Sequence, residues 1–193
     1  MIRIRQILDF VCFIKAKEVI DPSLKKMEKA NTAETVISPY LPGAIGHITA
    51  LHGEYYSRNW NFGLFFETKV ATELSALLTH KHSDRNGFWL ALCSDIIAGG
   101  IAIDGNRKDP QEARLRFFIV SEDYQGLGIG NLLMDKAITF CKEKKFAKVH
   151  LSTFAGLDAA RHLYEKRGFR LIGETEDCTW GVVVKEQIFE LVF

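Results

Sequence analysis

Three glycines at alternate positions, Gly126, Gly128 and Gly130, mark the part of the chain best suited to chemistry. A strand-like run, residues 115–120, precedes them, and an amphipathic helical pattern begins at Ile129. Glycine lets the backbone adopt positive φ and removes the Cβ atoms that would keep a ligand away. The freed N–H groups would then lie at the start of a helix, where the helix dipole favours phosphate oxygens. The alternative is a tight strand-to-helix turn that binds no ligand.

The residues after the loop exclude two common nucleotide-binding motifs. The dinucleotide motif G-x-G-x-x-G needs a third glycine where this chain has Asn131. The next strand, residues 148–153, also has no acidic residue at its end to hold a ribose. A P-loop needs Lys followed by Ser or Thr, whereas Gly130 is followed by Asn131 and Leu132.

Two motifs together resemble the GNAT superfamily of N-acetyltransferases. The form Gln125-x-x-Gly128-x-Gly130 is similar to its pyrophosphate-binding signature, [RQ]-x-x-G-x-[GA]. A second segment resembles the superfamily's A-x-x-L-Y-x-x-x-G-F pattern through Ala160, Leu163, Tyr164, Gly168 and Phe169. The resemblance covers about residues 36–193, and peripheral stretches such as Trp180-Gly181 resemble the acetyltransferase half of MarR-GNAT fusion proteins. Residues 1–34 are too few for a winged helix, so no regulator function is expected.

The resemblance implies transfer of an acetyl group from acetyl-CoA, a co-substrate, to an amine. It implies that main-chain groups at Phe118, Ile119 and Val120 pair with the pantetheine arm as an added strand. Where the family often has asparagine, this chain has Thr153 followed by Phe154, so Thr153 or a main-chain group would substitute. The pyrophosphate would be bound by the N–H groups of Gln125, Gly126, Leu127, Gly128, Ile129, Gly130 and Asn131.

Tyr164 occupies the family's position for the acid that protonates the departing thiolate, beside the cofactor. A phenol with an ordinary pKa of about 10 keeps its proton near neutrality and can donate it to a thiolate whose conjugate pKa is about 8.5. The alternative is an interfacial tyrosine whose ring packs on the helix and whose hydroxyl meets water.

The base that accepts the amine proton is not evident in the sequence. Many relatives have a glutamate on the strand before the glycine loop, but this strand has Arg114 and Arg116. His52 and Glu54 are candidates, and ordered water is another. Each of these side chains could instead be merely solvated or structurally bonded. Arg116 would attract an acidic acceptor if it lies on the open face, or be an ordinary surface arginine.

Hydrophobic periodicity predicts an α+β protein with the element order β-α-α-β-β-β-α-β-α-β-β. Strict alternation on the strand at residues 113–120 would place Leu115, Phe117 and Ile119 on one face and Arg114, Arg116, Phe118 and Val120 on the other. The order is that of the GNAT fold, a mixed, mostly antiparallel sheet of about seven strands flanked by helices. We expect an acetyltransferase domain at residues 35–193 and an N-terminal extension at residues 1–34, which could be a packing helix, a homodimer arm or a partly disordered segment. The elements are expected at residues 35–41, 45–56, 64–79, 88–93, 96–103, 113–120, 129–141, 149–153, 157–167, 169–174 and 182–191.

Composition limits the partners and the compartment. The formal net charge is +1 and no Lys/Arg block appears, so no nucleic-acid partner is expected. No apolar run approaches the roughly 20 residues of a membrane span, and Asp9 interrupts the only stretch similar to a signal peptide. The four cysteines lie far apart without metal-ligand spacing, which favours a reducing, cytoplasmic setting and no metal site.

Three functions fit these residues. The first is an acetyl-CoA-dependent N-acetyltransferase acting on an amine of a small molecule or a protein. The second is a non-catalytic acyl-CoA-binding or sensing domain, suggested by the missing strand carboxylate and by Phe154. The third is an interaction module in which the glycine loop is only a turn.

Overall fold

The computed structural model describes residues 35–79, 84–105, 109–178 and 180–193, and there it confirms the predicted order of elements. The predicted extension at residues 1–34 lies outside the described residues. A short 3-10 turn, η2 (Glu122–Tyr124), is added before the glycine loop. The elements are β1 (Thr35–Ser38), α3 (Ala44–Trp60), α4 (Leu64–Thr79), β2 (Gly87–Cys93), β3 (Ile96–Gly105), β4 (Glu112–Val120), α5 (Ile129–Glu143), β5 (Lys148–Phe154), α6 (Asp158–Lys166), β6 (Arg170–Asp177) and β7 (Val184–Val192).

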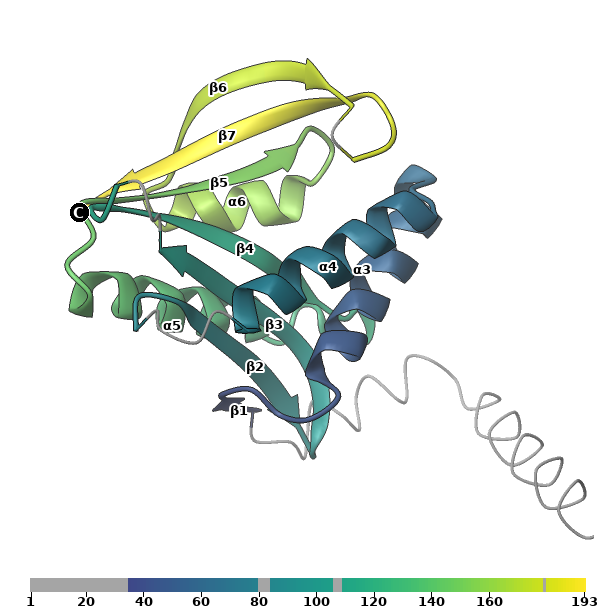
Figure 1. The fold of residues 1–193 in the computed structure, drawn as a ribbon, viewed down its shortest axis with the longest axis horizontal. Helices are drawn as coiled ribbons and strands as arrows, with labels where there is room; N and C mark the ends of the chain where they lie inside the picture. The colour runs from purple at the N-terminus through teal and green to yellow at the C-terminus, as the bar shows by residue number, and fades with distance from the viewer. Residues whose placement is uncertain (1–34, 80–83, 106–108, 179) are drawn as a thin grey trace, which may run out of the picture. The chain divides into compact units, whose positions relative to one another are not determined.

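The described strands form one seven-stranded sheet in the order β1-β2-β3-β4-β5-β7-β6 (Figure 1). Every neighbouring pair is antiparallel except β4 and β5, which are parallel. Parallel neighbours need a crossover connection, and here α5 supplies it. The predicted mixed, mostly antiparallel sheet is therefore confirmed.

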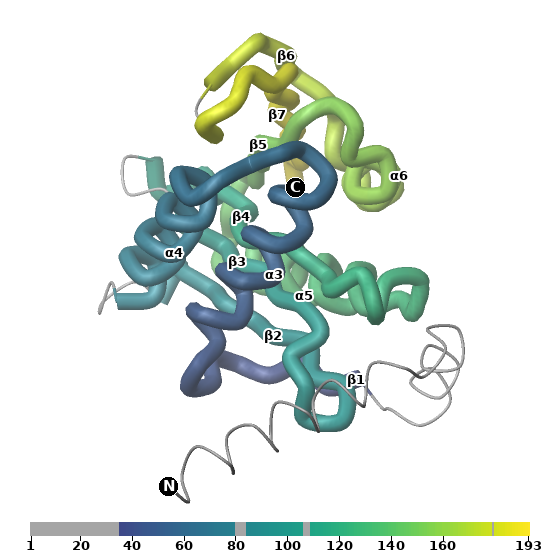
Figure 2. Tube along the Cα trace, turned by 90° about the vertical axis from the view of Figure 1, so that its right-hand side faces the viewer, coloured from purple at the N-terminus to yellow at the C-terminus, as the bar shows by residue number. Residues whose placement is uncertain are grey.

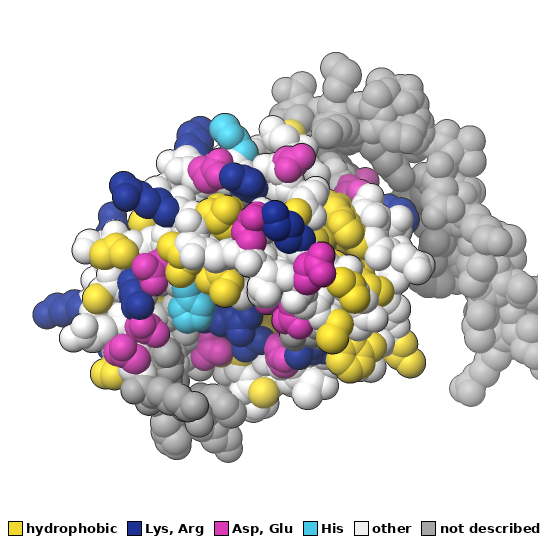
Figure 3. All heavy atoms as spheres, turned by 90° about the horizontal axis from the view of Figure 1, so that it is seen from above, with side chains coloured by type: hydrophobic (Ala, Val, Ile, Leu, Met, Phe, Trp, Pro, Cys, Tyr) yellow, Lys and Arg dark blue, Asp and Glu magenta, His cyan; other side chains and the backbone are white. Residues whose placement is uncertain are grey.

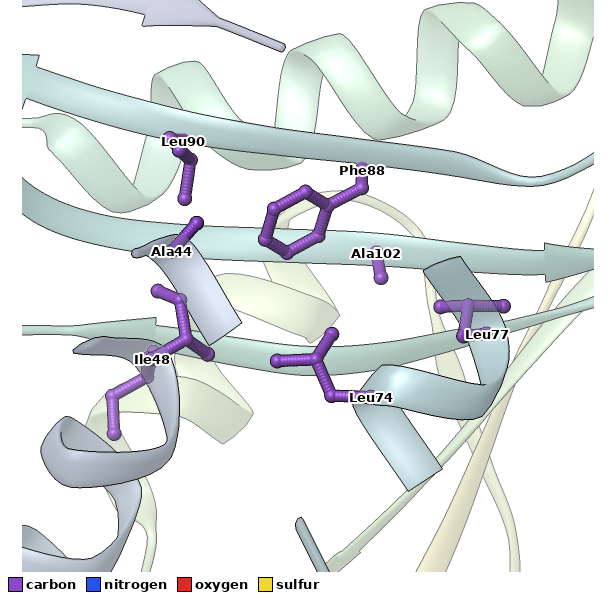
Figure 4. Packing of buried hydrophobic residues seen from close by; sticks show 8 residues of the cluster. Ala44, Ile48, Leu74, Leu77, Phe88, Leu90 and Ala102 are labelled. Atoms are coloured by element: carbon purple, nitrogen blue, oxygen red, sulfur yellow. The ribbon is translucent and has the colours of Figure 1, made fainter. Parts of the chain in front are cut away.

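Helices cover both faces of the sheet (Figures 1 and 2). On one face, α3 and α4 pack on β2 and β3, and Ile48 and Leu74 are fully buried against Phe88 and Leu90 (Figure 4). The next residue, Trp89, points to the other face, where its ring lies 5.1 Å from that of Phe140 on α5. Because successive side chains of a strand point to opposite faces of the sheet, neighbouring residues of β2 pack against different helices.

A β-bulge at Phe117 breaks the regular pleat of β4. Phe117 has a φ of 51°. Arg116 pairs with Ala102, and Ile119 pairs with Gly100. Between these two pairs, β4 therefore has one more residue than β3. The strict alternation predicted for this strand is therefore wrong after Arg116, because the extra residue moves Ile119 to the face that Arg116 occupies.

Beyond the bulge, β4 and β5 separate. Their register pairs join only Glu112–Arg114 with Lys148–His150, although β5 continues to pair with β7 as far as Phe154. From Leu115 onward, the edge of β4 that faces β5 thus has no strand partner among the described strands. This splay creates the space in which the predicted site residues lie.

Candidate active site

Two hollows flank the separated end of β4. The larger, the glycine-loop groove, has a volume of about 680 Å³ and lies between the loop before α5 and the start of α6. The smaller, the splay pocket, has a volume of about 100 Å³ and lies between β4, β5, α3 and α4. Tyr56 and Phe118 line both, so the two hollows adjoin through these rings.

The glycine loop has the conformation that its composition predicts. Gly126 and Gly128 have φ values of 83° and 81°, in the region that residues with a Cβ rarely adopt. A Cβ atom at either position would meet nothing within 4 Å, which shows that the loop is open toward the groove. Gly128 is also the N-cap of α5, a 15-residue helix. The loop therefore presents its backbone to the groove at the positive end of a helix dipole.

Five main-chain N–H groups of this loop have no backbone acceptor among the described residues. The Gln125 N–H donates to the Glu122 carbonyl at 3.3 Å, and the Asn131 N–H donates to the Gly128 carbonyl at 3.0 Å. These two N–H groups are thus engaged within the protein. The Gln125 side chain instead braces the loop, because its Nε2 donates to the Val120 carbonyl at 3.1 Å. The unengaged N–H groups are those of Gly126, Leu127, Gly128, Ile129 and Gly130.

Most of the predicted donor-site residues meet at the groove. The Leu127 side chain does not line it, and Thr153 and Tyr164 line the splay pocket instead. The groove can hold a diphosphate at the helix N-terminus and an extended chain along the unpaired edge of β4. The predicted residues that line it are Phe118, Ile119, Val120, Gln125, Gly126, Gly128, Ile129, Gly130 and Asn131.

Tyr164 lines the splay pocket. It is 6% exposed, and its ring lies 6.2 Å from Phe118 and 6.0 Å from Phe169. Burial raises the pKa of its phenol. The hydroxyl therefore keeps its proton at neutral pH and can donate a hydrogen bond to a group placed beside Phe118.

Of the two candidate bases, His52 lines the splay pocket and Glu54 lines neither hollow. The His52 Nδ1 lies 2.8 Å from the carbonyl of Ile48. A carbonyl can only accept, so Nδ1 carries the proton and Nε2 keeps its lone pair. Burial lowers the pKa of His52 to about 4, although its backbone hydrogen bond acts in the opposite direction. Glu54 is exposed, with its carboxylate 3.9 Å from Arg58.

Charged side chains from α4 also enter the pocket, and sequence reasoning missed them. Lys69 lies 2.9 Å from Glu73, which also pairs with Arg116. Burial raises the pKa of Glu73, but Lys69 and Arg116 outweigh it and leave that pKa below its ordinary value. Arg116 lies 3.2 Å from Asp104 as well and is only 16% exposed. It is therefore not an ordinary surface arginine, and it lines the pocket with its charge already paired. The hydrophobic periodicity of α4 predicts which of its residues are buried, but it does not predict that Glu73 lines the pocket.

Trp180 and Phe154 close the pocket with aromatic surface. Phe154 packs 5.6 Å from Tyr56, and Trp180 packs 5.9 Å from Phe66. The Trp180 Nε1 atom is buried, with no hydrogen-bond partner among the described residues. A buried N–H without an acceptor costs free energy, and because this atom is buried it is the aromatic surface of Trp180 that the pocket meets.

Other chemistries receive no support from the part of the chain that the structure describes. It contains no group of three or more His, Cys, Asp or Glu side chains placed to hold a metal ion. None of the helices there is both long and apolar enough to cross a membrane. The face seen in Figure 3 mixes acidic and basic side chains without a continuous basic patch.

Comparison with known proteins gives a consistent result. The family model described as the acetyltransferase (GNAT) family matches residues 47–169. N-acetylaspartate synthetase of Danio rerio is 34% identical over 106 residues, which cover 55% of this chain and 37% of that protein. Its counterpart in Xenopus tropicalis is 34% identical over 123 residues, covering 63% of this chain and 45% of that protein. Less than half of each relative's length is therefore matched.

A solved structure extends the likeness to most of the described fold. A GNAT-family acetyltransferase of Staphylococcus aureus superimposes with a TM-score of 0.66 at 20% identity, over 82% of this chain and 99% of that one. This similarity confirms the GNAT fold that the two sequence motifs predicted.

Proposed function

The chain belongs to the GNAT family of acetyltransferases, and from this premise we propose that it transfers an acetyl group from acetyl-CoA to an amine of a small molecule or a protein. The observation that carries the proposal is the meeting of two hollows at Tyr56 and Phe118: one presents five unengaged main-chain N–H groups, the other buried titratable side chains. Acetyl-CoA supplies the activated acetyl group as a thioester.

In the proposed donor site, the N–H groups from Gly126 to Gly130 bind the pyrophosphate. The main chain of Phe118, Ile119 and Val120 pairs with the pantetheine arm, since this edge of β4 has no strand partner. The acetyl group would then reach the junction between the groove and the splay pocket. Thr153 lies at that pocket and offers a hydroxyl in place of the family's asparagine.

In the proposed acceptor site, the amine nitrogen attacks the thioester carbonyl, so a C–N bond forms and the C–S bond breaks. Nε2 of His52 accepts a proton from the attacking nitrogen. A pKa of about 4 is adequate for this role, because the nitrogen becomes strongly acidic as the C–N bond forms. Tyr164 donates a hydrogen bond, and finally its proton, to the departing sulfur. Because burial raises the pKa of that phenol, solvent would rapidly restore its proton.

A non-catalytic acyl-CoA sensor is the second candidate. β4 has no carboxylate facing the splay pocket, and Phe154 rather than a polar residue ends β5. Calorimetry with acetyl-CoA, followed by thiol release measured over a panel of amines, separates the two functions. Tight binding and amine-dependent thiol release support the transferase. Tight binding of acetyl-CoA without thiol release in the presence of any amine would favour the sensor. The absence of binding would refute both functions.

We also propose that residues 35–193 form the catalytic domain and that the protein acts in the cytoplasm. Two described cysteines, Cys93 and Cys141, are buried and unpaired, as suits a reducing compartment. Cell fractionation against compartment markers tests the location, and activity of a chain starting at Thr35 tests the domain boundary.

A further inference from the structure

Arg114 is a charged residue of the splay pocket that forms no ion pair with any residue the structure describes. It lies on β4, two residues before Arg116 and directly opposite Asp104 of β3, so its side chain extends to the α4 face. Asp104 and Glu73 both pair with Arg116. Among the described residues, no carboxylate lies within 4 Å of the Arg114 guanidinium.

The charged side chains of the splay pocket have a net positive charge. The charged side chains that line the pocket are three cations and one carboxylate: Lys69, Arg114, Arg116 and Glu73. Burial and the neighbouring Arg116 lower the pKa of Arg114, while Glu73, Glu186 and Asp104 partly offset them from a distance. A half-buried cation with this balance is stabilised by an anion that enters the pocket.

The pocket has the size and the charge for a small anionic group. Its volume is about 100 Å³, and Arg114 lines it without being part of the glycine-loop groove. A carboxylate is the planar anion that a guanidinium fork binds through two parallel hydrogen bonds.

We propose that Arg114 binds a carboxylate of the acceptor, so that the substrate class is small amines that carry a carboxylate, such as free amino acids. This inference rests on the proposed acetyltransferase function and adds an anion subsite to its acceptor pocket. His52 lies on the α3 side of the same pocket, where it would receive the amine proton.

The test uses matched amines and matched variants. L-aspartate and β-alanine are compared with the same amines bearing carboxamides, by thiol release at saturating acetyl-CoA. Wild-type protein should acetylate the carboxylate forms with the higher kcat/KM. Arg114→Gln should lower that kcat/KM by roughly 10- to 100-fold through KM, since it removes a charge-assisted pair. The KM for acetyl-CoA and the rates with carboxamides should stay within about twofold.

Two further variants keep the result interpretable. Arg114→Lys, which retains the charge but not the fork, should lose less than the Gln variant, and Arg170→Gln, an exposed arginine that lines neither hollow, should behave as wild type. Thermal unfolding of Arg114→Gln should occur no lower than in wild type, because no ion pair is lost.

Each other outcome counts against the inference. Equal rates with carboxylates and carboxamides, a preference for phosphoethanolamine, or a marked loss of stability in Arg114→Gln would overturn it and leave the acetyltransferase intact. The absence of thiol release with any amine would instead refute the proposed acetyl transfer.

Discussion

The glycine-loop groove and the splay pocket are neighbours, but they are built from different parts of the polypeptide. The donors of the groove are main-chain N–H groups from five consecutive residues, Gly126–Gly130. The chemistry of the pocket comes from side chains on several separate elements, among them His52 on α3, Glu73 on α4 and Arg114 on β4. A backbone site depends on local conformation, whereas a side-chain site depends on how distant segments pack. The main-chain donors of the groove do not depend on side-chain identity, so this site suits a donor shared by a whole family. The side chains of the pocket can differ between members, so that site suits an acceptor specific to each one.

The largest effect should come where the two hollows meet. Tyr164→Phe removes the proposed proton donor while keeping the ring that packs against Phe118 and Phe169. We expect kcat to fall about 10²- to 10⁴-fold, the range for a positioned general acid. The KM for acetyl-CoA should change little, because the phenol does not line the groove. Steady-state kinetics from pH 6 to 9 measure both quantities, and unchanged turnover across that range would remove Tyr164 from the mechanism.

A backbone change should disable the groove alone. Gly128→Val forces a β-branched residue into a φ of 81° and adds a side chain on the open face of the loop. We expect the affinity for acetyl-CoA to fall about 100-fold, which combines this strain with displaced N–H donors. Calorimetry provides the measurement. Gly173→Ala is the matched control, since a Cβ there meets nothing within 4 Å and needs no positive φ. Equal affinities for the two variants would show that the loop does not bind the donor.

This contrast explains what could be predicted from sequence. The glycine loop, its flanking strand and helix, and Tyr164 were identified because each depends on short-range spacing. The bulge at Phe117 was missed, because an added residue in a strand leaves no mark on a hydrophobic pattern. Lys69, Glu73 and Trp180 were missed as pocket residues for a different reason, since their meeting is a property of tertiary packing.

The buried His52 should make the free energy of unfolding depend on pH. Its pKa in the folded protein is about 4, below the ordinary 6.5, so the unfolded chain binds a proton first as the pH falls. The stabilisation is complete above about pH 6.5 and is lost progressively down to about pH 4, by up to about 3 kcal/mol. His52→Gln should flatten this slope in denaturant titrations and lower kcat about 10²-fold, the lower end of the range for a positioned general base. A slope equal to that of wild type would mean that His52 is not buried and neutral.

The smallest effect tests whether pocket charge, rather than any single contact, sets acceptor preference. Glu73→Gln removes the carboxylate that pairs with Lys69 and Arg116 and leaves Asp104 as the remaining partner of Arg116. Stability should fall by about 1 kcal/mol, because these groups are only partly buried. The KM for a carboxylate-bearing amine should nevertheless decrease, about two- to threefold, since the pocket gains positive charge. Glu54→Gln, on an exposed residue that lines neither hollow, controls for the loss of one negative charge. A rise in KM for Glu73→Gln would instead indicate that Glu73 contacts the amine, so the sign of this small change identifies which end of the acceptor meets α4.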